Sequence, residues 1–314
     1  MTPRTAPPTR ARISASAAVC VAAALLVVAP TAEAAGHAAG AGSTSFSVAP
    51  DRAATAVAFW TPERRAAATP TTGSGSVAAA APRPTGAVDD RAAAETGHAQ
   101  RVPRVSHMGR MYFTIGDDTR WCTANVVESP NRSTIATAAH CVTQGGKYAS
   151  SMVFYPDEQG GDAPFGAWAV VGGRVTAGYT AGGDDDALDS AFLVVARDQD
   201  HVDITSRVGA SPVLFDVPAR QAVTAYGYPG AGRFDGTSLQ RCTATGSQVS
   251  PQQIAFRCDM TGGASGGPIL AGDSSEAPQF ANIANVYGDE SHNLGPLWQG
   301  LQHEAYDEAS VIAN

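Results

Sequence analysis

The sequence has no cluster of lysine and arginine from Gly109 onward, and the formal net charge of the whole chain at pH 7 is −8. Nucleic-acid binding needs a basic surface, so nucleic acid is not expected as a partner. No two cysteines have the close Cys-x-x-Cys spacing that supports a zinc site, and we expect neither a metal nor a cofactor. No long stretch has helical periodicity until the C-terminal end. What remains is a β-rich chain.

The first 34 residues have the features of a signal peptide. Three arginines precede an apolar run from Ala15 to Ala29, which is too short to span a membrane comfortably. The sequence Ala32-Glu33-Ala34 has the small-x-small pattern of a cleavage site. We therefore expect cleavage after Ala34 and a secreted, extracellular protein with no stable membrane association. An uncleaved anchor is the alternative, which the lack of a long apolar stretch disfavours.

Residues 35–104 consist mostly of Ala, Thr, Pro, Gly and Ser, with few large apolar side chains. Their burial cannot offset the entropy cost of ordering the chain, which predicts a largely disordered pro-segment or linker. Its best-ordered part should be 46–65, where Phe59 and Trp60 can dock onto another surface. The stretch Arg101-Val102-Pro103-Arg104 offers basic cleavage points. Residues 105–314 should form the folded domain.

Loss of the signal peptide removes Cys20 and leaves Cys122, Cys141, Cys242 and Cys258. An even number of cysteines in an exported chain indicates two disulfides, for which three pairings exist. We favour the local pairs, Cys122 with Cys141 and Cys242 with Cys258. Each pair would join neighbouring strands.

Short β-rich runs broken by Gly, Pro, Asp and Asn follow one another from residue 109. Their number and spacing predict barrels or a sandwich of about twelve strands. A helix from Leu301 to Val311 should close the fold. The predicted strands are 110–115, 122–127, 133–137, 152–155, 167–171, 191–196, 213–215, 222–228, 239–243, 254–258, 269–270 and 281–287.

Glycines surround one serine in Thr261-Gly262-Gly263-Ala264-Ser265-Gly266-Gly267-Pro268. A serine hydroxyl is a poor nucleophile at neutral pH, so it needs a base, and the attacked carbonyl oxygen needs hydrogen-bond donors. Gly263 has no side chain to obstruct an amide that points into the site. The amides of Gly263 and Ser265 are therefore candidates for an oxyanion hole. Taken in isolation, the turn is equally consistent with a glycine-rich surface loop.

Two other stretches supply the groups that such a serine needs. His140 follows a predicted strand in Thr137-Ala138-Ala139-His140-Cys141, where small neighbours and a cysteine leave it accessible but fixed, as suits a general base. Asp189 lies where an acidic loop meets an apolar strand, and a carboxylate there can orient the histidine. Asp186 is the alternative acid. We interpret residues 184–186 as a solvated loop, with calcium binding as the other interpretation.

The order His140, Asp189, Ser265 differs from the Asp, His, Ser order of subtilisins and the Ser, Asp, His order of α/β-hydrolases. With its flanking residues, it resembles the trypsin/chymotrypsin family of serine proteases from about Gly109 to the C-terminus. Tyr226-Gly227-Tyr228-Pro229-Gly230, together with the approach to the serine turn, is similar to the secreted bacterial branch that includes the glutamyl endopeptidases.

The resemblance implies an all-β fold of two perpendicular, six-stranded antiparallel β-barrels followed by the C-terminal helix. The triad would lie in the cleft between the barrels, and the substrates would be proteins or peptides. In the family's disulfide pattern, Cys122–Cys141 would brace the loop that carries His140. A binding protein that has lost catalysis and an esterase are the alternative functions.

Activation is where the chain departs from many family members. They have Asp directly before the nucleophilic serine, where it pairs with the new N-terminus after activation; this chain has Ala264. That ion pair cannot form. We therefore expect any activation to depend on the removal of a covering pro-segment.

Substrate specificity is the second departure. Asp259 lies six residues before Ser265, the spacing of the acid that binds Lys or Arg in trypsin-like enzymes. Cys258 is farther from the serine than the family's pocket cysteine, so Asp259 is either a pocket residue or a structural carboxylate. Glutamyl endopeptidases have a histidine where this chain has Val286, so acidic specificity is not indicated. Tyr287 and Gly288 are predicted to form the pocket wall that binds the substrate backbone.

Overall fold

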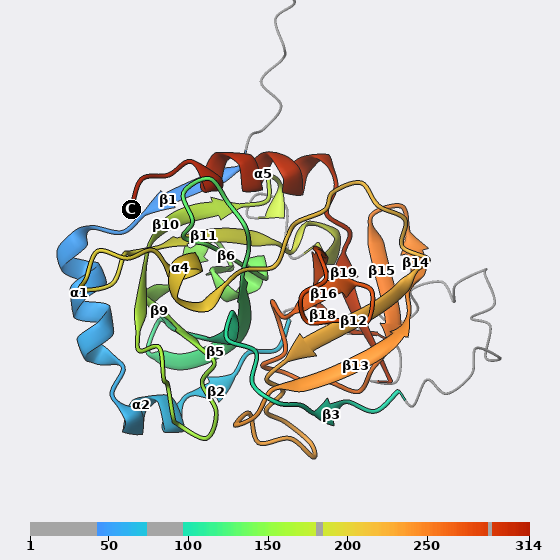
Figure 1. Cartoon of the computed structure of the whole chain (residues 1–314), viewed down its shortest axis with the longest axis horizontal. Helices are drawn as coiled ribbons and strands as arrows, with labels where there is room; N and C mark the ends of the chain where they lie inside the picture. Colours follow the sequence, from blue (N-terminus) through green and yellow to red (C-terminus); the bar gives the residue numbers. More distant parts are fainter. Residues whose placement is uncertain (1–42, 74–96, 180–184, 288–290) are drawn as a thin grey trace, which may run out of the picture. The chain divides into compact units, whose positions relative to one another are not determined.

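The computed structural model describes residues 43–73, 97–179, 185–287 and 291–314. The predicted signal peptide, with Cys20, lies outside these ranges. Residues from Gly40 to the C-terminus belong to one unit (Figure 1). None of the helices in the described ranges has both the length and the apolar character needed to cross a membrane.

Strands dominate the described part of the chain. The helices are α1 (Pro50–Phe59), α2 (Pro62–Ala67), α4 (Ile204–Val208) and α5 (Gly300–Ser310), with short 3-10 turns η1 (Ala139–Cys141) and η2 (Asp186–Leu188). The strands are β1 (Thr44–Ser47), β2 (Thr69–Pro70), β3 (Gln100–Arg101), β4 (Met108–Ile115), β5 (Asp118–Val126), β6 (Thr134–Thr137), β7 (Thr143–Gln144), β8 (Lys147–Tyr148), β9 (Ser150–Pro156), β10 (Trp168–Val175), β11 (Ala191–Val195), β12 (Ala222–Gly227), β13 (Gln240–Thr245), β14 (Ser247–Ser250), β15 (Gln253–Arg257), β16 (Pro268–Ala271), β17 (Gln279–Asn282), β18 (Asn285–Tyr287) and β19 (His292–Pro296).

Six antiparallel strands close into a barrel. They run in the order β10-β11-β6-β5-β4-β9, and β9 pairs back onto β10 with Phe154 opposite Trp168. Met111, Phe154 and Leu193 are among the fully buried side chains of its core. Closure leaves few unpaired edges, and the side chains that alternate inward fill the interior. One of the two predicted six-stranded antiparallel barrels is confirmed as a closed sheet.

The second half of the domain has its strands in two sheets. Their orders are β17-β16-β12-β13-β3 and β14-β15-β19-β18. A bridge between Ala281 and Leu297 links them, and both contribute to a core that includes Val223, Ile254 and Phe280. In Figure 1 these strands lie beside the barrel, and α5 runs along one end of both halves.

Both disulfides join the predicted local pairs, Cys122 with Cys141 and Cys242 with Cys258. The first ties β5 to η1, and the second ties β13 to the residue after β15. The predicted closing helix is also confirmed as α5, whose first turn has a capping box between Gln299 and Gln302.

Two predicted strands differ from the structure. The run 213–215 is not a strand, because only Val213 makes a bridge, to Gln279. The run 281–287 is divided between β17 and β18, which pair with different partners.

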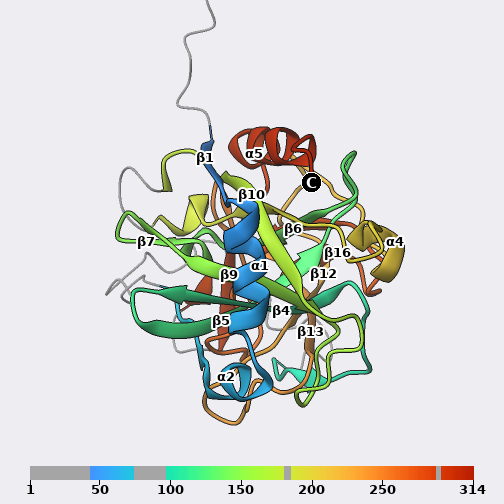
Figure 2. The same ribbon diagram turned by 90° about the vertical axis from the view of Figure 1, so that its left-hand side faces the viewer.

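An N-terminal segment, residues 43–73, packs on the barrel. β1 extends the sheet by pairing with β10, and α1 lies across β9 and β10 (Figure 2). Pro50 and Pro62 occupy first-turn positions of α1 and α2, where a missing N–H costs nothing. Composition predicted order only for 46–65; the structure has helices and strands from Thr44 to Pro70 that use the barrel as their support.

Candidate active site

Two neighbouring strands bring His140 and Asp189 together. His140 lies in η1 just after β6, and Asp189 lies just before β11. Because β6 and β11 are antiparallel, with Thr137 opposite Ala191, the end of one lies beside the start of the other. The predicted base and acid therefore meet at one rim of the barrel.

The Asp189 carboxylate accepts two hydrogen bonds from the same residue. Oδ2 lies 2.6 Å from His140 Nδ1, and Oδ1 accepts from the His140 backbone N–H at 2.9 Å. Both side chains are buried, with exposed fractions of 0% and 1%. An ionised carboxylate can only accept, so Nδ1 must carry the proton. This leaves Nε2 as the basic nitrogen.

Asn282, at the end of β17, fixes the backbone beside this pair. Its Nδ2 donates to the Asp189 carbonyl at 2.9 Å. Its Oδ1 accepts from Ser190 Oγ at 2.6 Å and from Trp298 Nε1 at 3.0 Å. Asn282 was not among the predicted site residues. The feature that could have indicated it is a single polar residue within the otherwise apolar run 280–284, all of which is buried.

Thr123 on β5 holds the serine turn in place. Its N–H donates to the Ser265 carbonyl at 2.9 Å, and its hydroxyl donates to the Gly263 carbonyl at 2.8 Å. The same hydroxyl accepts from the Tyr228 amide at 2.9 Å. The turn between β15 and β16 is therefore anchored to the barrel that carries His140, a tertiary contact that no local sequence pattern predicts.

Close packing explains two glycines of the turn. Gly263 and Gly266 have φ angles of +92° and +80°, which other residues rarely adopt. A Cβ at Gly266 would lie 2.1 Å from Thr137 Oγ1, and one at Gly263 would lie 2.6 Å from the Tyr228 carbonyl oxygen. Glycine is therefore required at these two positions for a steric reason as well as for the exposure of the amides.

A carbonyl of the N-terminal segment reaches the predicted oxyanion hole. The Gly263 amide donates to the Thr71 carbonyl oxygen at 2.7 Å, and Ser265 Oγ lies 3.5 Å from that oxygen. The Thr71 amide donates to the Trp121 carbonyl at 3.0 Å, directly after β2 pairs with β5. Sequence analysis placed no residue of 43–73 in the site.

A cavity of about 200 Å³ opens beside Ser265. Asn285 and Val286 of β18 line it, whereas Tyr287, at the end of that strand, pairs through its backbone with His292. Gly288 lies outside the described residues. The described residues that line the cavity are Thr72, Gly73, Ala231, Gly232, Met260, Thr261, Gly262, Ser265, Ile283, Ala284, Asn285, Val286 and Asn293.

Asp259 is not among these lining residues, because other groups engage its carboxylate. Oδ1 accepts from the Ala99 amide at 2.7 Å, Arg233 Nε lies 2.9 Å from Oδ2, and His98 Nδ1 lies 3.0 Å from Oδ2. Although burial alone would raise it, the pKa of Asp259 is lowered by the Ala99 amide, His98 and Arg233. In the full chain, these contacts favour the structural interpretation of Asp259 over a role in the pocket.

Asp186, the alternative acid, begins η2 and is half-buried. Burial, followed by the negative charge of Asp189, raises its pKa to about 6. The carboxylate that accepts the two hydrogen bonds of His140 is that of Asp189 and not that of Asp186. Asp184, part of the calcium interpretation, lies outside the described residues.

One group of three metal-type ligands occurs among the described residues: Cys122, His140 and Cys141. Both cysteines are joined in a disulfide, so their sulfurs are not available as thiolates. The group does not fit a metal site.

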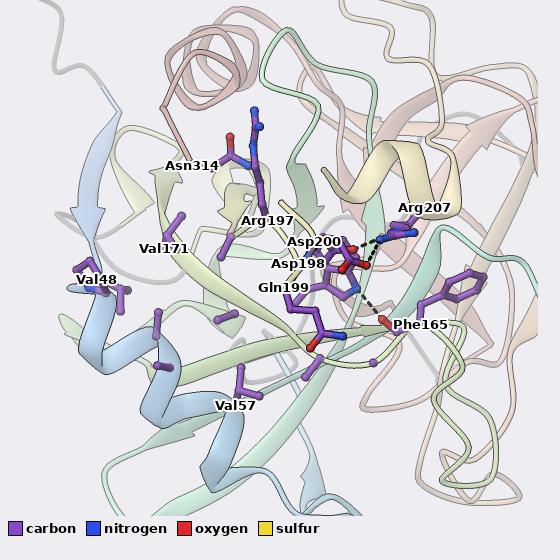
Figure 3. Close-up of a pocket in the computed structure, with 18 of the residues that line it drawn as sticks. Val48, Val57, Phe165, Val171, Arg197, Asp198, Gln199, Asp200, Arg207 and Asn314 are labelled. Atoms are coloured by element: carbon purple, nitrogen blue, oxygen red, sulfur yellow. Dashed lines mark hydrogen bonds and ion pairs between the residues drawn. The ribbon is translucent and has the colours of Figure 1, made fainter. Parts of the chain in front are cut away.

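A larger hollow, of about 1250 Å³, lies away from these residues (Figure 3). On one side it is lined by Val48, just before α1, and by Val57 of α1. On the other side it is lined by a loop that contains Asp198 and Asp200. Both carboxylates bind Arg207, at 2.6 and 2.8 Å. None of the triad candidates lines this hollow, and its acidic groups already have a cation, whereas Ser265 lines the smaller cavity.

Comparison with known proteins agrees with this geometry. A family model described as a trypsin-like peptidase domain matches residues 122–276. The structure of the protease Anisep from Arthrobacter nicotinovorans is similar at 32% sequence identity and a TM-score of 0.62, over 68% of this chain and 100% of the other. The chain belongs to the trypsin-like serine peptidases.

Two further structures are similar to this trypsin-like peptidase. A thermostable serine protease, AL20, from an extremophilic microorganism has 33% identity and a TM-score of 0.62, over 66% of this chain and 97% of the other. A Glu endopeptidase has 18% identity and a TM-score of 0.56, over 68% and 97%, which shows the fold alone. No curated protein sequence matched.

Proposed function

We propose that this trypsin-like peptidase is a secreted serine endopeptidase that uses His140, Asp189 and Ser265. Ser265 Oγ attacks the carbonyl carbon of a peptide bond while His140 Nε2 takes the hydroxyl proton. The imidazolium then protonates the leaving amine, and an acyl-enzyme ester remains. Water attacks this ester as His140 takes a water proton, which releases the acid and restores Ser265. Asp189 holds the imidazole throughout.

The buried His140–Asp189 pair is the observation that carries the proposal. A carboxylate that accepts both N–H groups of one histidine fixes the ring and stabilises the imidazolium that forms during proton transfer. The Gly263 amide supports it, because that amide already binds a peptide carbonyl oxygen within 3.5 Å of Ser265 Oγ. An oxyanion hole needs a donor at that place. The two disulfides and the trypsin-like relatives fit an extracellular protein.

Labelling of the secreted, processed protein with a fluorophosphonate tests the triad. Mass spectrometry should locate the label on Ser265, and the Ser265→Ala variant should fold, take no label and cleave no peptide. A label together with cleavage of esters but not of peptides would indicate an esterase. Absence of label on folded, processed protein would indicate a binding protein.

The segment 43–73 makes the full chain a zymogen. The Thr71 carbonyl occupies the donor that a substrate carbonyl needs, and Thr72 and Gly73 line the adjoining cavity. Since Ala264 cannot form the activating ion pair of other family members, physical cover is the available means of inhibition. A substrate can enter only after this part of the segment has moved.

Two anchors hold the segment. Trp60 is 2% exposed, and its Nε1 donates to the Ser151 carbonyl at 2.6 Å. Arg65 Nε lies 2.9 Å from Oε1 of Glu158, whose side chain is fully buried. We expect N-terminal sequencing of the fluorophosphonate-reactive species to start after Gly73, near Arg104. Reactive protein that begins before Thr44 would contradict the zymogen proposal without affecting the triad.

A further inference from the structure

The cavity beside Ser265 contains a hydrogen-bond acceptor that the described residues leave unused. Asn293, on β19, is 1% exposed and lines this cavity. Its Nδ2 donates to the Met260 carbonyl at 2.8 Å, whereas its Oδ1 has no hydrogen-bond partner among the residues that the structure describes. A carbonyl can only accept, so the bond to Met260 identifies the amide nitrogen and leaves the oxygen as the unused atom.

Two other polar side chains around the cavity, those of Thr261 and Asn285, are already engaged. Thr261 Oγ1 donates to the Ala231 carbonyl at 3.0 Å and accepts from its amide at 3.1 Å. Asn285 Oδ1 accepts from the Val286 amide at 2.9 Å. None of the described residues that line the cavity is charged. The Asn293 oxygen is thus the polar feature that a ligand would meet at this depth.

An acceptor buried without a partner destabilises the protein, and a ligand with a donor recovers that cost. A ligand with another acceptor or with an apolar end does not. A cationic end would donate, but it would also lose its hydration in a cavity whose described lining offers no counter-charge. The chemistry therefore favours an uncharged group with an N–H or O–H.

Position identifies which part of a substrate would enter. Ser265 itself lines the cavity, as do Thr261 and Gly262, which lead into the oxyanion hole. The substrate residue nearest to Ser265 is the one whose carbonyl is attacked. Its side chain is the one that reaches this cavity, which has a volume of about 200 Å³ while Thr72 and Gly73 still line it.

We propose that Asn293 determines the substrate specificity of the peptidase, selecting a residue before the cleaved bond that ends in an uncharged hydrogen-bond donor, with glutamine as the test case. This rests on the proposed endopeptidase function. The glutamine amide nitrogen donates to Asn293 Oδ1. Glutamate has the same shape but presents acceptors to an acceptor, and methionine has a similar length without a donor.

Four peptides that differ only in having Gln, Met, Glu or Lys before the cleaved bond test this proposal. Secreted, processed protein is used, with active sites counted by the fluorophosphonate. We expect kcat/KM for Gln to exceed that for Met and Lys by at least about tenfold, and that for Glu by about a hundredfold. A preference of the wild type for Met, Glu or Lys over Gln would overturn the proposal and needs no variant.

The Asn293→Leu variant separates specificity from structure. It should lose the preference for Gln over Met, because its side chain has a similar size but no acceptor, while active-site counts report how much of it folds. Asn285→Ala, at the same cavity, is the matched control and should keep the preference. A Gln-to-Met ratio unchanged in Asn293→Leu would count against Asn293. Failure of the proposed function itself is distinct: no label and no cleavage of any of the four peptides.

Discussion

The two sides of the cleft differ in how complete they are. On the base side, His140 and Asp189 satisfy each other within the barrel and are buried. On the nucleophile side, the Gly263 amide binds Thr71, a residue almost two hundred positions earlier in the chain. One side is assembled by strands that are adjacent in the sheet. The other is engaged by a segment that, in the zymogen proposal, leaves before a substrate binds.

This difference teaches that catalytic geometry and accessibility are set by separate parts of the chain. The barrel fixes the base through the pairing of β6 with β11, whatever the N-terminal segment does. In the zymogen proposal the segment controls access through a small set of contacts, chiefly those of Trp60, Arg65 and Thr71. Substitutions on the two sides should therefore have opposite effects on activity.

The largest effect is expected from breaking the base side with Asp189→Asn. The amide keeps the shape of the carboxylate but cannot stabilise the imidazolium, and it favours the wrong tautomer of His140. We expect kcat of the processed protein to fall by about 10⁴-fold with little change in KM. Steady-state kinetics on a peptide substrate measures it. A loss below tenfold would assign the acid role to another carboxylate, and Asp186→Asn is the control for that outcome.

Removing one disulfide at a time compares the two sides directly. Cys122–Cys141 closes a separation of 19 residues and Cys242–Cys258 one of 16. Their similar loop lengths predict similar losses of stability, about 3 kcal/mol each, when both cysteines of a pair become alanine. Because Cys141 adjoins His140, the first double variant should also lose much more activity per folded molecule. Denaturant melts and active-site counts separate the two quantities, and equal activity losses would contradict the assignment.

The three residues of the candidate triad could be picked out from the sequence because each lies in a short local pattern. His140, Asp189 and Ser265 are each flanked by small or apolar residues that position them, and their order limits the fold. Thr123, Asn282 and Thr71 act through tertiary contacts, and nothing in their own neighbourhoods indicates these partners. Asn293 belongs with them, since its environment depends on where β19 packs.

Two of the strands that were not predicted, β14 and β19, share a physical cause. β14 reads Ser-Gln-Val-Ser and β19 reads His-Asn-Leu-Gly-Pro, so neither has the alternation of apolar and polar residues that marks a half-buried strand. Sheet pairing with β15 stabilises both. The helices α1 and α2 were missed although Thr61-Pro62 is a helix-start signal, because a composition poor in large apolar residues outweighed it. The barrel surface supplies the apolar partner that the segment lacks.

Loosening the segment should have a smaller effect, in the activating direction. Arg65→Ala removes the ion pair with Glu158, which keeps Tyr112 and Arg110 as partners at 2.8 and 3.2 Å. We expect the fluorophosphonate to label the full chain about tenfold faster, a change of about 1.4 kcal/mol in the cover's hold on the cleft. Arg64→Ala is the matched control, because the Arg64 guanidinium bonds to the Phe59 carbonyl and lies over the Phe59 ring, both within the segment itself. Equal labelling rates for both variants would mean that Arg65 does not hold the cover.

The smallest effect concerns the pH dependence of stability on the base side. The pKa of Asp186 is 3.8 in the reference state and about 6 in the fold, so the folded protein binds more protons than the unfolded chain between these values. Stability from this group is therefore full below about pH 4 and is lost as the pH rises through 6. Asp186→Asn removes the titration and should reduce the difference in unfolding free energy between pH 4 and pH 7 by on the order of 1 kcal/mol.

Urea melts at the two pH values measure this difference, with Asp117→Asn, at an exposed turn, as the control. An unchanged difference in Asp186→Asn would mean that water or a local rearrangement relieves the burial of Asp186. A reduced difference would show that the base side carries a second, strained carboxylate next to Asp189. The nucleophile side has no equivalent among the described residues that line its cavity, because that lining contains no charged side chain. The pH response of the cleft would then arise from the barrel alone.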